Sequence, residues 1–244
     1  MAARPKYRRV LLKLSGEAFG KGSASGVDIE SVRHIAARIA LLHKAGIQLA
    51  LVVGGGNIIR GSMFAGTGVH AVAADSMGML STVINGIVLQ DVLESKNVNT
   101  RLLTAIPITP VAEPFIRRRC IRHLEKGRVV ILAAGTGSPH FTTDTAAALR
   151  AREIHADVLL KATNVDGVFS ADPRKNPKAK RYQRLSYEDV LRNDLRVMDA
   201  TAISLCREGH MPIIVFNMDE VGNIRDAIFG KPVGTYIGEK ENVA

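Results

Sequence analysis

Short apolar runs alternate along this chain with longer segments in which apolar residues recur every three or four positions. The run VLLKL at residues 10–14 is typical of a buried strand, whereas residues 29–44, with Val32, Ile35, Ile39 and Leu42 on one face, are typical of a helix. The same patterns predict further strands at residues 49–53, 101–104, 129–133, 157–161, 213–216 and 235–237, and further helices at residues 71–94, 115–124, 145–154, 186–192, 199–207 and 224–228.

The predicted strands are almost continuously apolar rather than alternating, which indicates that both of their faces are buried. Strands that alternate with helices favour a mostly parallel sheet between two helical layers. The sequence therefore predicts an α/β fold, a three-layer αβα sandwich with a central, mostly parallel sheet. No internal repeat or low-complexity linker divides the 244 residues, so we expect a single domain.

The composition, with 46% hydrophobic and 23% charged residues, is that of an ordinary globular domain. No tract approaches the ~18 to 20 continuous apolar residues of a membrane helix. Lys13 interrupts the apolar stretch after the basic N-terminus, and no small-residue cleavage site follows, which argues against a secretory signal. Cys120 and Cys206 have no partner at metal-ligand spacing, so we expect buried, reduced thiols in a cytoplasmic protein.

The formal net charge of +10 is compatible with two kinds of partner, nucleic acids and small polyanions such as nucleotides. Basic residues gather at 117–119 and at 174–184. Aromatic residues make up only 5% of the chain and tryptophan is absent, which leaves little material for stacking on bases. Both clusters are therefore interpreted as solvated faces or loops.

Four predicted strands run directly into small or hydroxyl-bearing residues. The turns read Ser15-Gly16, Gly54-Gly55-Gly56, Gly135-Thr136-Gly137 and Ala162-Thr163-Asn164. The carboxyl ends of parallel strands lie at one edge of a sheet, and ligands bind in the crevice outside that edge. Turns of this kind expose backbone N–H groups, so the sequence predicts an anion site there. The alternative is that the glycines only make tight connections between strands and helices.

The familiar phosphate-binding motifs do not fit these turns. The dinucleotide pattern G-x-G-x-x-G fails because Ile59 stands at its third glycine position, and the Walker A pattern occurs nowhere. The H-R-D and D-F-G motifs of protein kinases are also absent. Any phosphoryl transfer by this chain requires a different architecture.

Charged residues near the strand ends suit a polyanionic ligand. Lys13 and Lys161 lie at the ends of apolar strands, where they would neutralise a transferring phosphoryl group, and Arg60 would clamp a phosphate. Asp144 would hold the lysines, with a helix N-cap as its alternative role. Asp75 would accept hydrogen bonds from a ribose, and its alternative role is to complement the helix dipole.

Six segments of the chain together resemble the bacterial UMP kinases (uridylate kinases), a family within the amino acid kinase superfamily. They read KLSGEAFG, VVGGGNIIRG, ILAAGTGSPHFTTDTAAALRAREI, KATNVDGVFSADP and FNMDEVGNI, with ADSMGMLSTVINGIVLQDVLE between the second and third. The resemblance covers essentially the whole chain in co-linear order. It implies the amino acid kinase fold in a single domain, 1–244, with residues 8–155 approximately the monophosphate-binding part and residues 156–240 the ATP-binding part.

The activity implied by the resemblance is reversible transfer of the ATP γ-phosphoryl group to UMP, which forms UDP in de novo pyrimidine nucleotide biosynthesis. Mg²⁺ would enter with ATP and be held by phosphate oxygens and water, with no protein side chain as a metal ligand. GTP and UTP are implied as effectors, and a homohexamer built on long helices such as residues 71–94 is implied as the assembly. Neither nucleic acid nor a membrane is expected as a partner.

The resemblance also assigns site residues, position by position. It implies Lys13, Arg60, Asp144 and Lys161 as catalytic residues. It implies ATP contacts at Lys13, Leu14, Ser15, Gly16, Gly56, Arg60, Thr163, Asn164, Phe169 and Asp172. It implies UMP contacts at Gly55, Asp75, Thr136, Gly137, Ser138, Pro139, His140, Phe141, Thr142 and Thr143, and a GTP-responsive segment at Lys21, Gly22, Ser23, Ala24, Ser25 and Gly26.

This chain departs from the family pattern at Ser138 and His140, where an asparagine and an aromatic residue are frequent. Two other functions remain open: a related kinase acting on a carbamoyl group or an amino-acid carboxylate, and a catalytically silent nucleotide-binding or nucleic-acid-binding regulator. The loop TGSPHFTTD argues against the first, and the presence of all four expected catalytic residues argues against the second.

Overall fold

The computed structural model describes residues 4–20, 26–173, 175–195, 197–220 and 222–240. Every helix and strand expected from the apolar pattern is present. In chain order the elements are β1 (Arg9–Leu14), η1 (Gly16–Phe19), α1 (Ile29–Lys44), β2 (Gln48–Val53), η2 (Gly61–Phe64), α2 (Ala71–Glu94), β3 (Thr100–Thr104), β4 (Glu113–Pro114), α3 (Arg117–Glu125), β5 (Val129–Ala133), α4 (Thr143–Glu153), β6 (Val158–Thr163), β7 (Arg184–Ser186), α5 (Tyr187–Arg192), α6 (Ala200–Glu208), β8 (Ile213–Asn217), α7 (Asn223–Ile228) and β9 (Thr235–Gly238).

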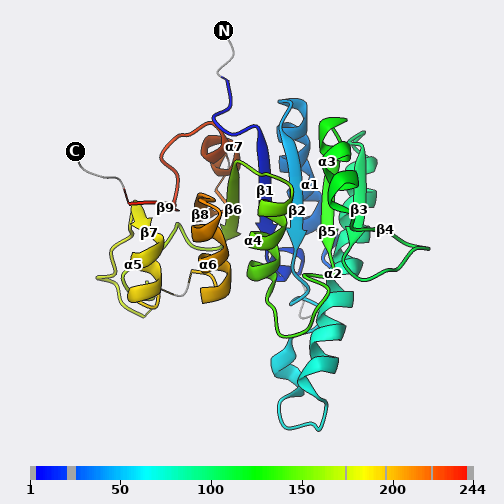
Figure 1. The fold of residues 1–244 in the computed structure, drawn as a ribbon, viewed down its shortest axis with the longest axis horizontal. Coiled ribbons are helices and arrows are strands. Elements are labelled where there is room, and N and C mark those ends of the chain that lie inside the picture. Colours follow the sequence, from blue (N-terminus) through cyan, green and yellow to red (C-terminus); the bar gives the residue numbers. More distant parts are fainter. Residues whose placement is uncertain (1–3, 21–25, 174, 196, 221, 241–244) are drawn as a thin grey trace.

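The described residues form one nine-stranded sheet with the strand order β4-β3-β5-β2-β1-β6-β8-β9-β7. All paired strands are parallel except β8 and β9, which are antiparallel. The prediction of a mostly parallel sheet is therefore confirmed. Because β1 lies between β2 and β6, the ends of these strands meet at one edge of the sheet (Figure 1).

Apolar side chains on the two faces of the sheet form two separate cores. One core joins the sheet to α1, α2 and α7, and includes Ile39, Leu89 and Ile228. The other joins the sheet to helices α3, α4, α5 and α6, and includes Leu124 and Ala151. This arrangement confirms the three-layer αβα sandwich, and Figure 1 shows the second group of helices in front of the strands.

Helix α4 begins two residues earlier than its apolar pattern predicted. Thr142 is the N-cap residue, and its hydroxyl accepts hydrogen bonds from the backbone N–H groups of Asp144 and Thr145. The alternative role of Asp144 as the N-cap is therefore wrong. Because Thr142 caps the helix, the carboxylate of Asp144 is left to bind other groups.

Helix α2 extends past the edge of the sheet at the tip of the molecule (Figure 1). Its length and composition are those of a helix that could cross a membrane, although a core helix of a globular protein passes the same test. Its inner residues, among them Val83, Leu89 and Leu93, belong to the core. Leu80, Ile84 and Ile87 remain exposed. Some apolar residues of α2 therefore pack in the core, whereas others face the solvent.

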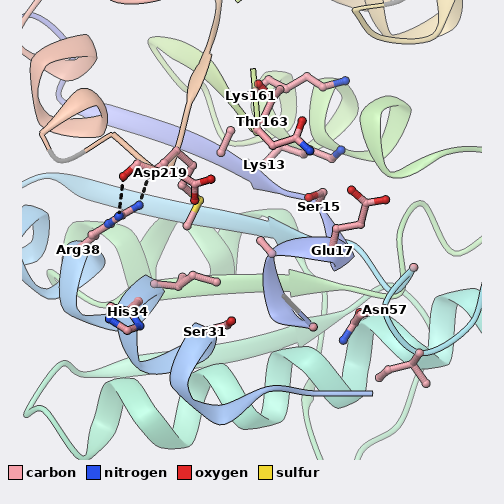
Figure 2. Close-up of a pocket in the computed structure, with 18 of the residues that line it drawn as sticks. Lys13, Ser15, Glu17, Ser31, His34, Arg38, Asn57, Lys161, Thr163 and Asp219 are labelled. Carbon is pink, nitrogen blue, oxygen red and sulfur yellow. Dashed lines mark hydrogen bonds between the residues drawn. The ribbon is translucent and has the colours of Figure 1, made fainter. Parts of the chain in front are cut away.

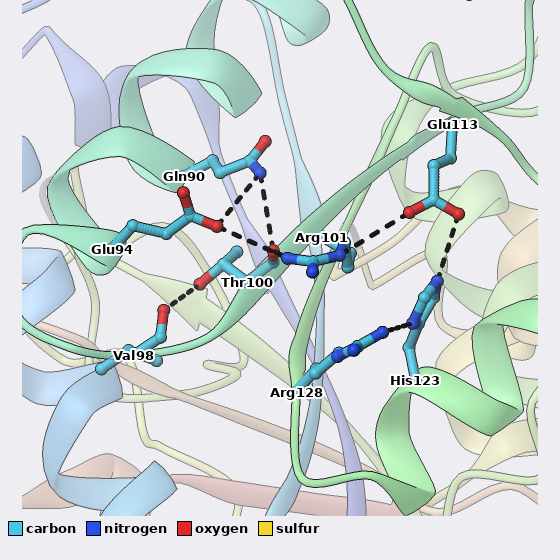
Figure 3. A network of polar contacts seen from close by, with 8 residues as sticks. All are labelled: Gln90, Glu94, Val98, Thr100, Arg101, Glu113, His123 and Arg128. Carbon is cyan, nitrogen blue, oxygen red and sulfur yellow. Dashed lines mark hydrogen bonds and ion pairs between the residues drawn. The ribbon is translucent and has the colours of Figure 1, made fainter.

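A network of polar side chains covers the sheet edge beside β3 and β4 (Figure 3). Arg101 approaches both Glu94 and Glu113, at 3.6 and 3.8 Å, and Glu113 also contacts His123 at 3.2 Å. Arg119, from the basic run 117–119, lies 3.8 Å from the same Glu113 carboxylate. One residue of this basic cluster therefore has a nearby carboxylate.

Both cysteines are buried and unpaired, as their sequence context suggested. Burial raises the pKa of the Cys120 thiol and of the Cys206 thiol to about 12. A thiol with such a high pKa carries little of the reactive thiolate at neutral pH. The two residues act as small apolar side chains of the core.

Candidate active site

Lys13 and Lys161 occupy facing positions on the adjacent parallel strands β1 and β6. Neighbouring residues on a strand point to opposite faces, so each lysine shares the face of the leucine two residues before it, Leu11 or Leu159. Both leucines belong to the core beneath α4. The two ammonium groups therefore extend toward the first turn of α4, where Asp144 lies.

Asp144 binds both ammonium groups. Its Oδ1 lies 3.0 Å from Lys13 Nζ, and its Oδ2 accepts a hydrogen bond of 2.7 Å from Lys161 Nζ. All three side chains are largely buried, with exposures of 10% for Lys13, 13% for Lys161 and 15% for Asp144. Within this cluster, two positive charges contact one negative charge at the wall of a cavity, an arrangement that favours an anion as a further partner.

Burial and charge act in opposite directions on Asp144. Burial raises the pKa of its carboxyl group, but the charges of Lys13 and Lys161 outweigh burial and hold the pKa below its ordinary value of 3.8. Burial also lowers the pKa of Lys161 below its ordinary value of 10.5, and the charge of Asp144 offsets only part of this effect. Asp144 is therefore ionised at neutral pH and can fix both lysines.

The glycines after β1 and β2 allow two turns to approach each other closely. A Cβ atom at Gly16 would lie 2.3 Å from the backbone nitrogen of Gly56, and one at Gly55 would lie 2.7 Å from Cβ of Ser81 on α2. Any side chain at these positions would force the turns apart. Gly56 has open space on its Cβ side, with Arg60 as its nearest neighbour at 3.8 Å.

A cavity of about 880 Å³ opens beside the lysines and these turns. Lys13, Lys161 and Thr163 lie on one side of it, and Ser31, His34 and Arg38 of α1 lie on another (Figure 2). Arg38 donates hydrogen bonds to the carbonyl groups of Met218 and Asp219, which closes the wall between α1 and the segment after β8. The cavity is large enough for a nucleotide.

Most residues expected to contact ATP lie around this cavity. Lys13, Ser15, Gly56, Arg60, Thr163 and Asn164 line it. Leu14 and Gly16 are buried beneath it. Phe169 and Asp172 are not among the residues that line it, and Phe169 pairs with Arg181 in an isolated β-bridge.

Arg60 lies at the mouth of the cavity and already has partners. Its guanidinium group donates to the Glu17 carboxylate at 2.8 Å and to the Gly56 carbonyl at 2.9 Å. Both charged side chains are more than half exposed. A phosphate that binds Arg60 must therefore compete with Glu17 for the guanidinium group.

The residues expected to bind UMP form a second group, beside the first. Asp75 of α2 accepts a hydrogen bond of 2.8 Å from the backbone N–H of His140, which brings the helix and the loop 136–143 together. Gly55 packs on the same helix. Ser138, His140, Phe141 and Thr142 are exposed, whereas Thr136, Gly137, Pro139 and Thr143 are half-buried. Of the expected GTP segment, residues 21–25 lie outside the described residues, and Gly26 bonds to Asn57.

Three polar residues that support these turns were not predicted. Buried Asn85 donates to the Gly54 carbonyl at 2.7 Å and pairs with Asn57 through two side-chain hydrogen bonds. Asp199, the N-cap of α6, accepts hydrogen bonds from the hydroxyl groups of Thr142 and Thr145. Asn85 interrupts an apolar helix, which is a signal in the sequence, whereas the partners of Asp199 are visible only in the fold.

These features define an α/β protein with a positively charged cavity at the carboxyl edge of a parallel sheet. Two lysines and a carboxylate supply the charge, and glycine turns supply backbone access. The amino acid kinase family model matches residues 8–217, which is most of the chain. The chain belongs to the amino acid kinase family.

Solved structures of two bacterial proteins and one archaeal protein are similar over nearly the whole chain. The UMP kinase from Bacillus anthracis is 43% identical, with a TM-score of 0.94 over 97% of this chain and 98% of that protein. The UMP kinase from Ureaplasma parvum is 36% identical, with a TM-score of 0.90 over 96% and 100%. The uridylate kinase from Archaeoglobus fulgidus is 30% identical, with a TM-score of 0.72 over 94% and 99%.

Proposed function

We propose that this protein transfers the γ-phosphoryl group of ATP to UMP and forms UDP and ADP. The observation that carries the proposal is the buried Lys13–Asp144–Lys161 cluster, which faces a nucleotide-sized cavity. The similarity to proteins described as UMP kinases supplies the identity of the acceptor. The product, UDP, connects the reaction to pyrimidine nucleotide biosynthesis.

The proposed transfer is a direct in-line displacement. An oxygen of the UMP phosphate forms a bond to the γ-phosphorus, and the bond from that phosphorus to the β–γ bridging oxygen breaks, so ADP leaves with the electron pair. A phosphate monoester is already ionised near neutral pH, so a strong general base is not required. Catalysis then depends on positioning and on neutralisation of charge.

Lys13 and Lys161 are assigned to charge neutralisation during the transfer. Their ammonium groups stabilise negative charge on the moving phosphoryl group and on the leaving oxygen. Asp144 does not react in this scheme, because it holds the two ammonium groups at fixed positions. Preorganised charges in a buried site cost little reorganisation as the transition state forms.

The two substrates are assigned to neighbouring regions. ATP is assigned to the cavity, with its phosphates near Lys13, Ser15 and Gly56. UMP is assigned to Asp75, Gly55 and the loop 136–143. The order of strands supports this division of the single domain, because β2, β5 and β3 lie on one side of β1, and β6 and β8 lie on the other.

ATP is proposed to enter as its magnesium complex. In the part of the chain that the structure describes, no three His, Cys, Asp or Glu side chains gather as a metal site. Asp144 is already bound by two lysines. Phosphate oxygens and water are therefore proposed as the ligands of the ion, as Mg²⁺ commonly prefers.

The proposal extends to regulation, assembly and location. GTP and UTP are proposed as effectors on the basis of the family resemblance alone. A homohexamer is proposed from the family resemblance, and the exposed apolar side chains Leu80, Ile84 and Ile87 on α2 support contact between copies. The cytoplasm is the proposed location, because ATP and UMP are available there. Neither nucleic acid nor a membrane is required by the proposed reaction.

A coupled assay of ADP release tests the proposed function. ATP is supplied with UMP, CMP, carbamate or N-acetylglutamate in parallel, and turnover with UMP should be fastest. GTP and UTP are then added in turn to test the proposed effectors. Turnover with carbamate or N-acetylglutamate but not with UMP would assign the chain to another reaction of the family.

A further inference from the structure

Ala134 adopts a backbone conformation that alanine seldom tolerates. Its φ is +61°, in the left-handed region, and the residue is completely buried after strand β5. Gly135 follows with a φ of +59°, and the Gly137 N–H bonds back to the Ala134 carbonyl. A left-handed residue other than glycine persists only where its surroundings hold it in place, and such residues concentrate at functional sites.

Thr82 of α2 holds this residue. Its hydroxyl oxygen accepts a hydrogen bond of 2.7 Å from the Ala134 N–H, and the same hydroxyl donates to the Met79 carbonyl at 2.7 Å. Thr82 is only 5% exposed. A hydroxyl group serves both partners at once, whereas a valine of the same shape serves neither.

One face of α2 supports the loop from Ala134 to Thr143 at both of its ends. Asp75, Met79 and Thr82 follow the i, i+4, i+7 spacing of a single helix face. Thr82 binds the start of the loop, and Asp75 binds the His140 N–H at 2.8 Å near its end. Between them, Met79 lies 3.9 Å from the position that a Cβ atom at Gly135 would occupy.

Arg150 approaches the loop from the opposite side, on helix α4. It is 6% exposed, and its guanidinium carbon lies 4.0 Å from the centre of the Phe115 ring. One of its N–H groups points to the Thr136 carbonyl at 3.5 Å. The start of the loop is therefore enclosed between two helices, with the shorter and better-buried hydrogen bond on the Thr82 side.

We infer that Thr82 is a positioning residue for the acceptor nucleotide. Its hydroxyl keeps Ala134 in the left-handed conformation and so places the loop 136–143 against Asp75. Thr82 acts through the loop and does not touch the substrate itself. This inference rests on the proposed function, since it concerns the site to which UMP is assigned.

The test replaces Thr82 and measures both substrates separately. Thr82→Val removes the hydroxyl at nearly constant shape, and we expect the KM for UMP to rise roughly tenfold, as for a buried N–H that loses its partner. The KM for ATP should change by less than a factor of about two, because the cavity at Lys13 does not depend on this contact. Thr82→Ser keeps a hydroxyl group and should restore the KM for UMP.

Thr100→Val is the matched control. Thr100 is completely buried, and its hydroxyl donates to the Val98 carbonyl at the start of β3, away from the loop. Both variants lose a buried hydroxyl, but only the one at position 82 should alter the KM for UMP. An unchanged KM for UMP in Thr82→Val, or equal rises for UMP and ATP, would overturn the inference.

Two further measurements test the inference if Thr82→Val folds poorly or if the proposed function is wrong. If Thr82→Val folds poorly, Ala134→Gly is added, because glycine tolerates the left-handed conformation. The double variant should regain thermal stability, and its KM for UMP should fall toward the wild-type value, because glycine at position 134 adopts the left-handed conformation without the hydroxyl. Amide hydrogen exchange in residues 134–143 should be faster in Thr82→Val than in the wild type, and this holds even if the wild type phosphorylates an acceptor other than UMP. Unchanged exchange would count against the inference alone.

Discussion

Lys13 and Lys161 are single charges within apolar strands, and each would be costly to bury without a partner. Asp144 supplies the one carboxylate that both lysines share. Because one negative charge cannot balance two positive charges, the cluster remains an incomplete ion pair. The proposed phosphate ligand would complete it, so the same residues account for the cost of the free state and for the proposed preference for an anion.

The first prediction concerns the role of Lys13. Lys13→Met should lower kcat by a factor of about 100 or more, because a charge that stabilises the transition state is lost. The fold should persist, since methionine fills the same volume and relieves a buried charge. The coupled ADP assay measures kcat, and circular dichroism with thermal melting checks the fold. Lys126→Met, at an exposed lysine, is the control and should leave kcat unchanged.

The second prediction concerns pH. Because the pKa of Lys161 lies below 10.5, the ammonium form is lost as the pH rises through this lowered value. The kcat/KM, which reports the ligand-free enzyme, should therefore decline on the alkaline side with an apparent pKa below 10.5. Lys161→Arg keeps its charge at every pH tested, so its residual activity should lack this decline. A wild-type profile that stays flat through pH 10.5 would contradict the assignment.

At the residue scale, the sequence predicted the charged cluster but not its support. The sequence revealed this cluster because its members lie at the ends of predicted elements. Lys13 and Lys161 lie at the ends of apolar strands, and Asp144 lies at the start of a helix. Asn85 and Asp199 depend on partners 28 and 54 positions away, Asn57 and Thr145. No local pattern records such a distance, so these contacts required the three-dimensional structure.

At the element scale, the long apolar strands and the amphipathic helices followed directly from their periodicity. The edge strands β4 and β7 were not predicted, because β4 has two residues and β7 has three. Segments this short carry no periodic signal, and their pairing depends on neighbouring strands. The start of α4 was misplaced for another reason, since Asp144 is as reasonable a cap as Thr142 and only the backbone geometry separates them.

The third prediction concerns helix α2. Asp75→Asn should raise the KM for UMP roughly tenfold, since a charge-assisted hydrogen bond to a ribose becomes a neutral one. The amide oxygen still accepts from the His140 N–H, so the loop should keep its position. Asp91→Asn, at an exposed aspartate on the same helix, is the control. An unchanged KM for UMP in Asp75→Asn would remove Asp75 from the acceptor site.

At the scale of the whole molecule, the parallel sheet explains why residues far apart in sequence share one site. Strand order places the ends of β2, β1 and β6 side by side, although 110 residues separate the start of β2 from that of β6. The sequence predicted this edge because parallel strands end on one side. The apolar pattern alone did not predict that α2 contacts the loop 136–143 and also carries an exposed apolar face, although the family resemblance assigned Asp75 to UMP and this helix to the assembly.

That exposed face leads to the last prediction. Leu80, Ile84 and Ile87 are 47%, 47% and 40% exposed, and they follow the i, i+4, i+7 spacing of one helix face. Water contact with three large aliphatic side chains is unfavourable by roughly 25 cal/mol for each Å² that a partner would cover. Packing against the same face of a second copy removes this cost, because a two-fold contact pairs a surface with itself.

Replacing Leu80, Ile84 and Ile87 together by glutamine should dissociate the proposed hexamer into smaller species, as measured by light scattering after size-exclusion chromatography. Leu41→Gln, at a 67% exposed leucine on α1, is the matched control and should leave the assembly intact. Since Asp75 and Thr82 lie on the same helix, the dissociated variant should also show a raised KM for UMP. A wild type that is monomeric at micromolar concentration would refute the self-contact, and a variant that stays hexameric would place the contact on another face.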